Sequence, residues 1–542
     1  MTSRAQTVFS GGTILTMEPE SPVAEALAIG PDGRILAVGR ESEVKILARS
    51  TTKQIDLQGK TLLPGFFDCH MHILPLGLAL MQVDLSPSVV KSVDDIVRLL
   101  RKRLEEQPDA PCILGNRYDH NRFTPPVHPT RYDLDKVCTD RPVRIEHTSG
   151  HAAVVNSYAL KLLNITRDTP DPIGGTIVRD AQGEPTGVLL ETASWQNLDK
   201  IIPPPTRSQQ VEALKLANRY LIERGITSAS DANTLPEEIE AYAQAVRNKA
   251  LQVRVNGMIA WAEVMRASGD NPPPPHEFHH PDVSGHQFHI GQAKLFSDGA
   301  ITTRTCRLSQ PFQDMPDNYG LFLHPPEELE AYILAAHQKG WQIATHAIGD
   351  AAIDLVLRCY AKAQRAHPRP RPGHRIEHCM LLTSDLIARL RRQHIWSIGQ
   401  PEFLMQLGDA YIAALGAERA NALSPYATLE AQGVAQAFSS DCPVVPGAPL
   451  DGIRAAMERK TPSGIVLNDQ ERVSAEVALY AYTASPAYAT RTDDDRGTLS
   501  AGKWADLVVL SENPMQVPLS EWERLNVVAT FIQGEQVYGE LA

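Results

Sequence analysis

The sequence predicts an α/β fold, a (β/α)8 TIM-like barrel combined with a composite β-sandwich that is built from both termini. Three observations support this prediction. Eight short apolar runs, separated in the later part of the chain by helical stretches, indicate a barrel of parallel strands. Short strands with glycine turns occur at both ends of the chain, and a long segment separates the first run from the second. We therefore expect a barrel at 61–494, a sandwich at 1–60 plus 495–542, and a large insertion after strand one at about 76–205.

The predicted barrel strands are apolar runs that end at polar residues. Runs of this length and composition are typical of strands that are buried on both faces. Helical segments such as EELEAYILAAHQKG and TSDLIARLRRQH lie between the later runs. The eight runs occupy residues 65–72, 226–232, 251–260, 288–299, 341–347, 373–379, 394–401 and 434–441.

The sandwich is predicted from strands with tight turns at the two ends of the chain. AEALAIGPDGRILAVG contains two alternating strands around a Pro-Asp-Gly turn, and TVFSGGTILTM is typical of a strand pair. Short strands with glycine turns are predicted again near the C-terminus, in GTLSAGKWADLVVLSENP and VVATFIQGEQVYG. A single discontinuous sandwich, closed by both termini, accounts for these segments.

The insertion has helices and strands of its own. SVDDIVRLLRKRLEE predicts a helix, RPVRIEHTSG and GGTIVRDAQGEPTGVLL predict strands, and three prolines at 203–205 mark the end of the insertion. A segment inserted after strand one leaves the barrel at the carboxyl ends of the strands. We therefore expect the insertion to cover the pocket at that face of the barrel.

Composition and charge exclude several classes of protein. The net charge is −12 and no basic cluster stands out, which argues against partners such as nucleic acid or an anionic membrane. No apolar run is long enough to span a bilayer, and the N-terminus lacks the apolar core of a signal peptide. The seven cysteines are odd in number and form no CxxC pair, so we expect a reducing, cytoplasmic setting.

Six residues of the kinds that bind metals lie at the ends of the predicted strands. His70 and His72 are two residues apart on one strand, so both imidazoles face the same side and can chelate one zinc ion. Each of the other histidines, taken alone, is also compatible with a hydrogen-bonded core residue. The six candidate metal ligands are His70, His72, Lys294, His346, His378 and Asp441.

Lys294 and Asp441 carry specific chemical expectations. An unpaired ammonium in an apolar strand is costly, but a lysine there can react with CO2 to form an anionic carbamate that bridges two metals. The alternative is a lysine whose ammonium reaches the surface. Asp441 can bind metal, accept a proton from a metal-held hydroxide or water, and pass that proton to the leaving group. In the two-metal interpretation His346 and His378 hold the second ion.

Other polar residues are candidates for substrate binding. His151 in SGHAAVVN can contact substrate or cap a loop, and Arg304 can bind a carboxylate or form a structural ion pair. Tyr118, with Asp119 and His120 in GNRYDHN, can line the pocket, although solvated loop polarity explains these residues as well. Gln400 can donate a hydrogen bond to substrate or cap a loop. The histidine-rich segment HEFHHPDVSGHQFH is expected to be a surface loop.

At this point the sequence resembles the amidohydrolase superfamily, and more narrowly its amidohydrolase-3, YtcJ-like branch, which includes N-substituted formamide deformylases. The resemblance rests on PGFFDCHMH, AKLFSDGAITTRT, THAIGDAAIDLVL, RIEHC and the closing GTLSAGKWADL. It implies the barrel and the sandwich, one or two divalent metals held by the six residues above, and hydrolysis of amide-type C–N bonds. Cys69 departs from the smaller residue that relatives often carry.

The expected activity is therefore that of a metal-dependent amidohydrolase, a hydrolase of carbon–nitrogen bonds other than peptide bonds. Its partner would be a small-molecule substrate such as an N-substituted formamide, attacked by a metal-bound hydroxide, and a homodimer is compatible with the fold. A mononuclear deaminase is one alternative, but such relatives carry a glutamate after the strand-five histidine, where HAIGD offers Asp350. A catalytically silent regulatory protein on the same fold is the other alternative.

Overall fold

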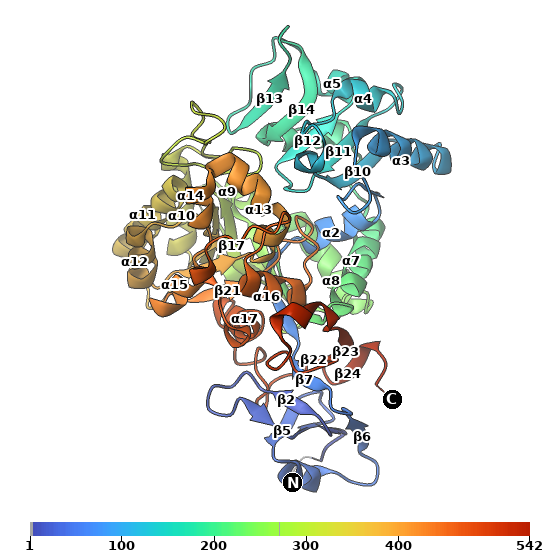
Figure 1. Ribbon diagram of the computed structural model, residues 1–542, viewed down its shortest axis with the longest axis vertical. Helices are drawn as coiled ribbons and strands as arrows, with labels where there is room; N and C mark the ends of the chain where they lie inside the picture. The colour runs from blue at the N-terminus through green and yellow to red at the C-terminus, as the bar shows by residue number, and fades with distance from the viewer. Residues whose placement is uncertain (1–3, 270, 542) are drawn as a thin grey trace.

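A nearly closed barrel of eight parallel strands forms the centre of the molecule (Figure 1). This computed structural model describes residues 4–269 and 271–541. The strands follow one another around the sheet in chain order, and each overlaps one of the eight predicted runs. The predicted barrel is thus confirmed. Its strands are β8 (Phe66–Met71), β15 (Ile226–Thr234), β16 (Arg254–Ala260), β17 (Phe288–Phe296), β18 (Gln342–Ala347), β19 (Arg375–His378), β20 (Trp396–Gly399) and β21 (Gln436–Phe438).

Hydrogen bonds just beyond the last strand join it to the first. The backbone N–H of Asp441 donates to the carbonyl oxygen of His70 over 2.8 Å, and the N–H of His72 donates to that of Cys442 over 2.8 Å. These bonds bring together candidate ligands that are far apart in the chain. The closure of the barrel therefore also assembles the site.

Helices lie between the strands and around the barrel. The first, α7, begins after Thr206, which forms a capping box with Gln209, directly after the three prolines at 203–205. Its buried face packs against the strands in the main hydrophobic core. The helices of this region are α7 (Arg207–Ile222), α8 (Ile239–Arg247), α9 (Trp261–Ser268), α10 (Pro326–Gln338), α11 (Asp350–Ala366), α12 (Ser384–Gln393), α13 (Glu402–Leu415), α14 (Ala417–Asn421), α15 (Tyr426–Ala431), α16 (Pro449–Glu458), α17 (Ala475–Ala481) and α18 (Ala484–Ala489).

Two sheets form the sandwich that the sequence predicts, the smaller from the N-terminal part of the chain and the larger from both ends. The smaller sheet has the order β5-β4-β1-β6 and the larger one β24-β23-β22-β7-β2-β3. Phe9 and Phe531 meet edge to face between the two sheets, with ring centroids 5.2 Å apart. The strands are β1 (Thr7–Ser10), β2 (Thr13–Leu15), β3 (Val23–Ala24), β4 (Ala26–Ile29), β5 (Ile35–Gly39), β6 (Lys53–Asp56), β7 (Thr61–Pro64), β22 (Leu507–Leu510), β23 (Val527–Ile532) and β24 (Glu535–Gly539).

The structure corrects one detail of this region. TVFSGGTILTM does form two strands, but β1 and β2 belong to different sheets and do not pair with each other. Gly11 has a φ of +77°, and a Cβ at Gly12 would lie 2.3 Å from the carbonyl oxygen of Lys60. The two glycines therefore carry the chain from one sheet to the other, where a larger residue would be strained or would clash.

The insertion forms a separate sheet at the opposite end of the barrel from the sandwich (Figure 1). Before it, α2 (Ile73–Leu80) still packs against α7, with Gly77 in close contact with Ala213. The sheet has the order β13-β14-β12-β11-β10-β9 and its own apolar core. Its elements are β9 (Val83–Asp84), α3 (Val93–Glu106), β10 (Ile113–Tyr118), α4 (Arg131–Asp135), β11 (Val143–His147), β12 (Ala152–Val155), α5 (Ser157–Leu163), β13 (Gly175–Arg179), β14 (Pro185–Glu191) and α6 (Thr192–Trp195).

Within 4–269 and 271–541, none of the helices combines the length and the apolar character that crossing a membrane requires.

Candidate metal centre

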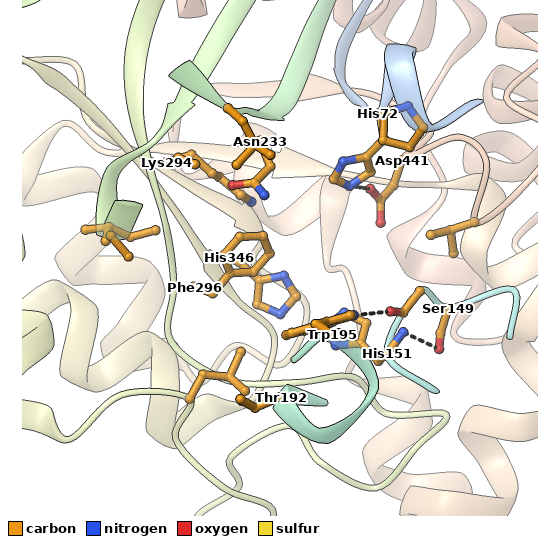
Figure 2. Close-up of a pocket in the computed structure, with 18 of the residues that line it drawn as sticks. His72, Ser149, His151, Thr192, Trp195, Asn233, Lys294, Phe296, His346 and Asp441 are labelled. Atoms are coloured by element: carbon orange, nitrogen blue, oxygen red, sulfur yellow. Dashed lines mark hydrogen bonds and ion pairs between the residues drawn. The ribbon is translucent and has the colours of Figure 1, made fainter. Parts of the chain in front are cut away.

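A cavity of about 1150 Å³ lies between the carboxyl ends of the barrel strands and the insertion. Figure 2 shows His72 and Asp441 side by side, with Lys294 and His346 across the cavity and side chains of the insertion, among them His151 and Trp195, facing them. All six residues predicted as metal ligands line this one cavity. They are His70, His72, Lys294, His346, His378 and Asp441.

The tightest group among them contains His70, His378 and Asp441. Their imidazole nitrogens and carboxylate oxygen lie within 4.8 Å of one another, as the ligands of a single ion do. Both His378 and Asp441 have a positive φ, at +69° and +60°. Residues with side chains rarely adopt this conformation, which costs about 1–3 kcal/mol each. The surrounding contacts hold both residues in a strained backbone that aims them at the site.

Two buried polar atoms in the cavity lack a hydrogen-bond partner among the described residues. They are Nζ of Lys294 and Oδ1 of Asp441. The Nε2 atoms of His70 and His72 nevertheless lie 3.3 Å and 3.1 Å from Oδ1 of Asp441. Two ligands at about 2.0–2.2 Å from one tetrahedral zinc ion are about 3.3 Å apart. The donor set thus fits a metal ion better than it fits direct hydrogen bonding.

A buried ionic network orients His70. Its Nδ1 is bonded to Glu377, which in turn accepts two hydrogen bonds from the Arg375 guanidinium, at 2.6 Å and 2.8 Å. Burial alone would raise the pKa of Glu377, but Arg375 and His70 hold it well below its usual range. The resulting carboxylate keeps the proton of His70 on Nδ1. Its Nε2 then presents a lone pair to the cavity, in the manner of a metal-binding histidine.

Neutral partners orient two of the other three histidines, His378 and His346. Nδ1 of His378 lies 2.8 Å from the side-chain oxygen of Gln400, and Nε2 of His346 lies 3.1 Å from the carbonyl oxygen of Gly299. Burial lowers the pKa of His378 to about 3, and it also lowers that of His346 well below its usual value. Both imidazoles are therefore neutral at pH 7, which is the form that binds metals.

Two further carboxylates fix the strand ends around the cavity. Asp68 accepts hydrogen bonds from the backbone N–H groups of His70 and Ser440, at 3.2 Å and 3.1 Å, and so ties β8 to the end of β21. Burial raises its pKa to about 6. Asp298 accepts from the N–H groups of Ile348 and Gly349 at the end of β18, and burial raises its pKa to about 7.

His151 is a residue of the insertion that lies beside the candidate ligands. Its ring centroid is 5.6 Å from that of His346, and its Nδ1 lies 2.6 Å from the fully buried carboxylate of Glu191. Burial would lower the pKa of His151, but Glu191 raises it overall. The imidazole is consequently a polar group that can donate a hydrogen bond inside the cavity, and Trp195 packs beside it.

Comparison with known proteins identifies this arrangement. The model of a family described as the amidohydrolase family matches residues 53–538. The chain belongs to the amidohydrolase family. It is 33% identical over 541 residues to the putative amidohydrolase YtcJ of Bacillus subtilis (strain 168), a match that covers 98% of this chain and 99% of the relative.

Two further similarities agree with this assignment. An N-substituted formamide deformylase of Arthrobacter pascens is 27% identical over 554 residues, covering 98% of each chain. The crystal structure of an uncharacterized metal-dependent hydrolase from Pyrococcus horikoshii OT3 superposes with a TM-score of 0.75 at 26% identity, covering 95% of this chain and 99% of the other. The fold and the resemblance predicted from the sequence are confirmed.

The amidohydrolase cavity includes only one of the three predicted substrate-binding residues. His151 lines it, whereas Tyr118 and Arg304 do not. Tyr118 is fully buried in the insertion with its hydroxyl 2.9 Å from Nδ1 of His128, and Arg304 pairs with Asp314 at 2.7 Å. Gln400 bonds to His378 inside the barrel.

The structure also differs from two expectations about polar loops. Asp119 is buried and not a solvated loop residue. The segment 276–289 begins with exposed histidines, as expected of a surface loop, but it ends on His289 within β17.

Sequence analysis missed the residues that support the candidate ligands of this amidohydrolase. Arg375, Glu377 and Asp68 stand within three residues of a predicted ligand, in apolar strands that are buried on both faces. A charged pair two residues apart in such a strand is a usable signal, since buried charges need partners. Glu191 has no such signal, because its partner His151 is forty residues earlier in the chain.

Proposed function

We propose that this protein is a metal-dependent hydrolase of carbon–nitrogen bonds other than peptide bonds, acting on an amide-type small molecule. The observation that carries the proposal is the convergence of six candidate ligands on one cavity in which Lys294 and Asp441 have unpartnered polar atoms. One or two divalent ions, with zinc the best match to the donors, would supply a nucleophile from water and polarise the carbonyl group. The formamide deformylase relative supports N-substituted formamides as the first substrates to test.

Asp441 is the proposed proton carrier. Hydrolysis forms a bond between a water oxygen and the carbonyl carbon, breaks the C–N bond, and moves a proton from the water to the leaving nitrogen. Burial would raise the pKa of Asp441, but His70 and His72 hold it well below its usual value, so the carboxylate is ionised at neutral pH, the form that can accept a proton.

His151 is the proposed group that binds the substrate carbonyl or its developing negative charge. It enters the cavity from the insertion, and Glu191 keeps its proton available for donation. Trp195 and Phe296 offer apolar surface on the same cavity, which suits the substituent on the amide nitrogen and keeps water away from the reacting group. The substrate would therefore be bound through its carbonyl oxygen and its apolar substituent.

Lys294 is the proposed site of a carbamate. It is 1% exposed, and burial lowers its pKa to about 8, which leaves part of the amine unprotonated near neutral pH. Reaction of that amine with CO2 forms an N–C bond and releases a proton, giving an anionic group in place of an unpartnered cation. Such a group would bridge two metal ions.

The deaminase alternative has less support in this structure. The carboxylate that follows the strand-five histidine, Asp350, accepts hydrogen bonds from the backbone and hydroxyl of Ser309 and does not line the cavity. It therefore lacks access to a substrate. The cytoplasmic location and the homodimer stay predictions.

The decisive experiment measures hydrolysis by protein reconstituted with zinc and bicarbonate. The substrates are N-substituted formamides, the matching acetamides and carbamates. An Asp441→Asn variant should lower kcat about 10²–10⁴-fold, because asparagine tolerates the positive φ but cannot accept the proton. Asp350→Asn removes a carboxylate outside the cavity and should keep wild-type activity. Equal activity of the wild type and Asp441→Asn would contradict the proposal.

A further inference from the structure

A second group of histidines and a carboxylate lies in the insertion, apart from the barrel site. Asp119 and His120 directly follow β10, and His147 ends β11, which runs parallel to β10 and pairs Tyr118 with His147. The candidate ligand atoms of Asp119, His120 and His147 lie within 4.8 Å of one another. The insertion thus repeats, on a smaller sheet, the placement of polar side chains at the carboxyl ends of parallel strands.

The distances inside this group match the spacing of ligands around one small ion. Nδ1 of His120 is 3.2 Å from Nε2 of His147, and that Nε2 is 3.5 Å from Oδ1 of Asp119. Two donors at about 2.0–2.1 Å from a tetrahedral zinc ion lie about 3.3–3.4 Å apart. Two of the three separations within the group therefore match those of ligands around one zinc ion, and the third lies within the 4.8 Å that encloses the group.

The carboxylate of the group is buried and held by its neighbours. Asp119 is only 3% exposed, and Asn121 donates to its Oδ1 from the backbone N–H and from the side-chain amide, each over 3.0 Å. Nε of Arg122 forms an ion pair with Oδ2 over 3.8 Å. Oδ2 is therefore paired with Arg122, while Oδ1 faces His147.

Neighbouring side chains hold the histidines in place. The hydroxyl of Ser149 lies 2.9 Å from Nδ1 of His147, and the backbone N–H of Ser149 donates to the same nitrogen over 3.1 Å. These contacts fix the ring with Nε2 facing Asp119 and His120. The ring of His128 stacks on that of His120 with centroids 3.6 Å apart, and it covers the group from one side. Tyr118 fixes His128 in turn.

We propose that Asp119, His120 and His147 form a second divalent-metal site, for which zinc suits the two nitrogen donors and one oxygen donor. The ion joins the ends of β10 and β11, and its fourth position is open to water or a small anion. Because His147 also lines the large cavity, the ion fixes the part of the insertion that covers the barrel site. This site is independent of whether the barrel site is catalytic.

Zinc counting on variants tests the proposal. Protein freed of metal with a chelator is dialysed against ZnCl2, and zinc per chain is measured by elemental analysis. The His120→Ala/His147→Ala variant should bind one zinc fewer than the wild type, and so should the same pair of changes in a protein whose barrel site is disabled by His346→Ala/His378→Ala. The control His276→Ala removes an exposed histidine of another loop and should leave the count unchanged.

A measurement on the unaltered protein covers the case in which the variants fail to fold. Crystals grown with ZnCl2 are measured at the zinc absorption edge, where anomalous scattering locates the ions. A peak between Asp119, His120 and His147 supports the site whatever is found in the barrel. The proposal is overturned if this position is empty while zinc occupies the barrel, or if the count is the same with and without the two histidines.

Discussion

The two clusters of histidines and carboxylates are supported in different ways. In the barrel cluster of His70, His378 and Asp441, the Nδ1 proton of His70 points to a buried, ionised Glu377 that Arg375 neutralises. In the insertion cluster of Asp119, His120 and His147, His147 contacts the neutral side chain of Ser149. Asp119 is bonded to the neutral amide of Asn121 and forms a partly exposed ion pair with Arg122 at 3.8 Å. The residue that supports His70 lies about three hundred positions later in the chain. In the insertion cluster, Ser149 and Asn121 are each only two positions from the residue that they support.

This difference indicates which substitutions of supporting residues should have the largest effect. A charged partner in a fully buried network is costly to remove, because the charge left behind has no water to solvate it. A neutral hydroxyl is cheaper to remove, because it leaves no unpaired charge behind. The effect of changing a supporting residue should therefore fall from the barrel to the insertion.

Glu377→Gln should have the largest effect. It leaves the Arg375 guanidinium buried without its counter-charge, which costs about 3–5 kcal/mol of unfolding free energy. It also removes the carboxylate that keeps the proton of His70 on Nδ1, which should lower zinc affinity about 10–100-fold. Urea denaturation and zinc titration measure the two effects. The control Glu512→Gln breaks the exposed ion pair with Arg524 and should cost less than about 1 kcal/mol. A similarly small cost for Glu377→Gln would contradict the claim that the charged support of the barrel cluster is costly to remove.

Gln400→Leu comes next, because it removes the neutral acceptor of His378 from a buried position. We expect about a tenfold loss of zinc affinity and about 1–3 kcal/mol of unfolding free energy. Gln400→Glu keeps an oxygen in the same place and should retain more of the affinity than the leucine variant, as zinc titration can show. Equal losses in both variants would mean that the packing of this side chain matters and its hydrogen bond does not.

Acid should destabilise the insertion through its buried imidazoles. Burial lowers the pKa of His128 to about 2 and that of His120 to about 3, against about 6.5 in an unfolded chain. Below pH 6.5 the unfolded chain therefore binds protons that the folded one excludes, and stability falls with pH until about pH 3. Since both rings are only partly buried, we expect His128→Asn to reduce the loss between pH 7 and pH 5 by on the order of 1 kcal/mol. Thermal unfolding at both pH values measures this, and parallel profiles for the two proteins would refute it.

Ser149→Ala should have the smallest effect. The neutral hydrogen bond to Nδ1 of His147 contributes about 0.5–1.5 kcal/mol, and the backbone N–H of Ser149 can still contact that nitrogen. Zinc binding at the insertion should weaken by only a few-fold in the titration. A loss as large as that of Glu377→Gln would show that the two clusters are supported equally, and the comparison would fail.

The sequence predicted the parts of this molecule that local pattern determines. Eight apolar runs gave eight strands, and residues at strand ends such as His70, Lys294 and His346 met in one cavity because parallel strands of a barrel share one carboxyl face. Pattern on one strand can also indicate that His70 and His72 face the same way.

The remaining features depend on contacts between distant segments. The partner of His70 is Glu377, three hundred residues later, and that pairing exists only once the barrel has closed. Tyr118 comes at the end of an apolar run, as a pocket residue would, but in the fold its side chain packs in the core of the insertion. The prediction that β1 and β2 pair was wrong for the same reason, because two adjacent glycines carry the chain into the other sheet.

The strand β7 has a consequence for the order in which the chain can fold during synthesis. It pairs with β22 along Thr61–Pro64 and leads directly into the first barrel strand. A ribosome releases β7 more than four hundred residues before it releases β22, so the edge of β7 stays open for most of translation. The barrel likewise cannot close on its first strand, β8, until its last strand, β21, has been synthesised. The nascent protein therefore completes the larger sheet of the sandwich last, and loss of the C-terminal strands β22–β24 would expose the edge of β7 near the start of the chain.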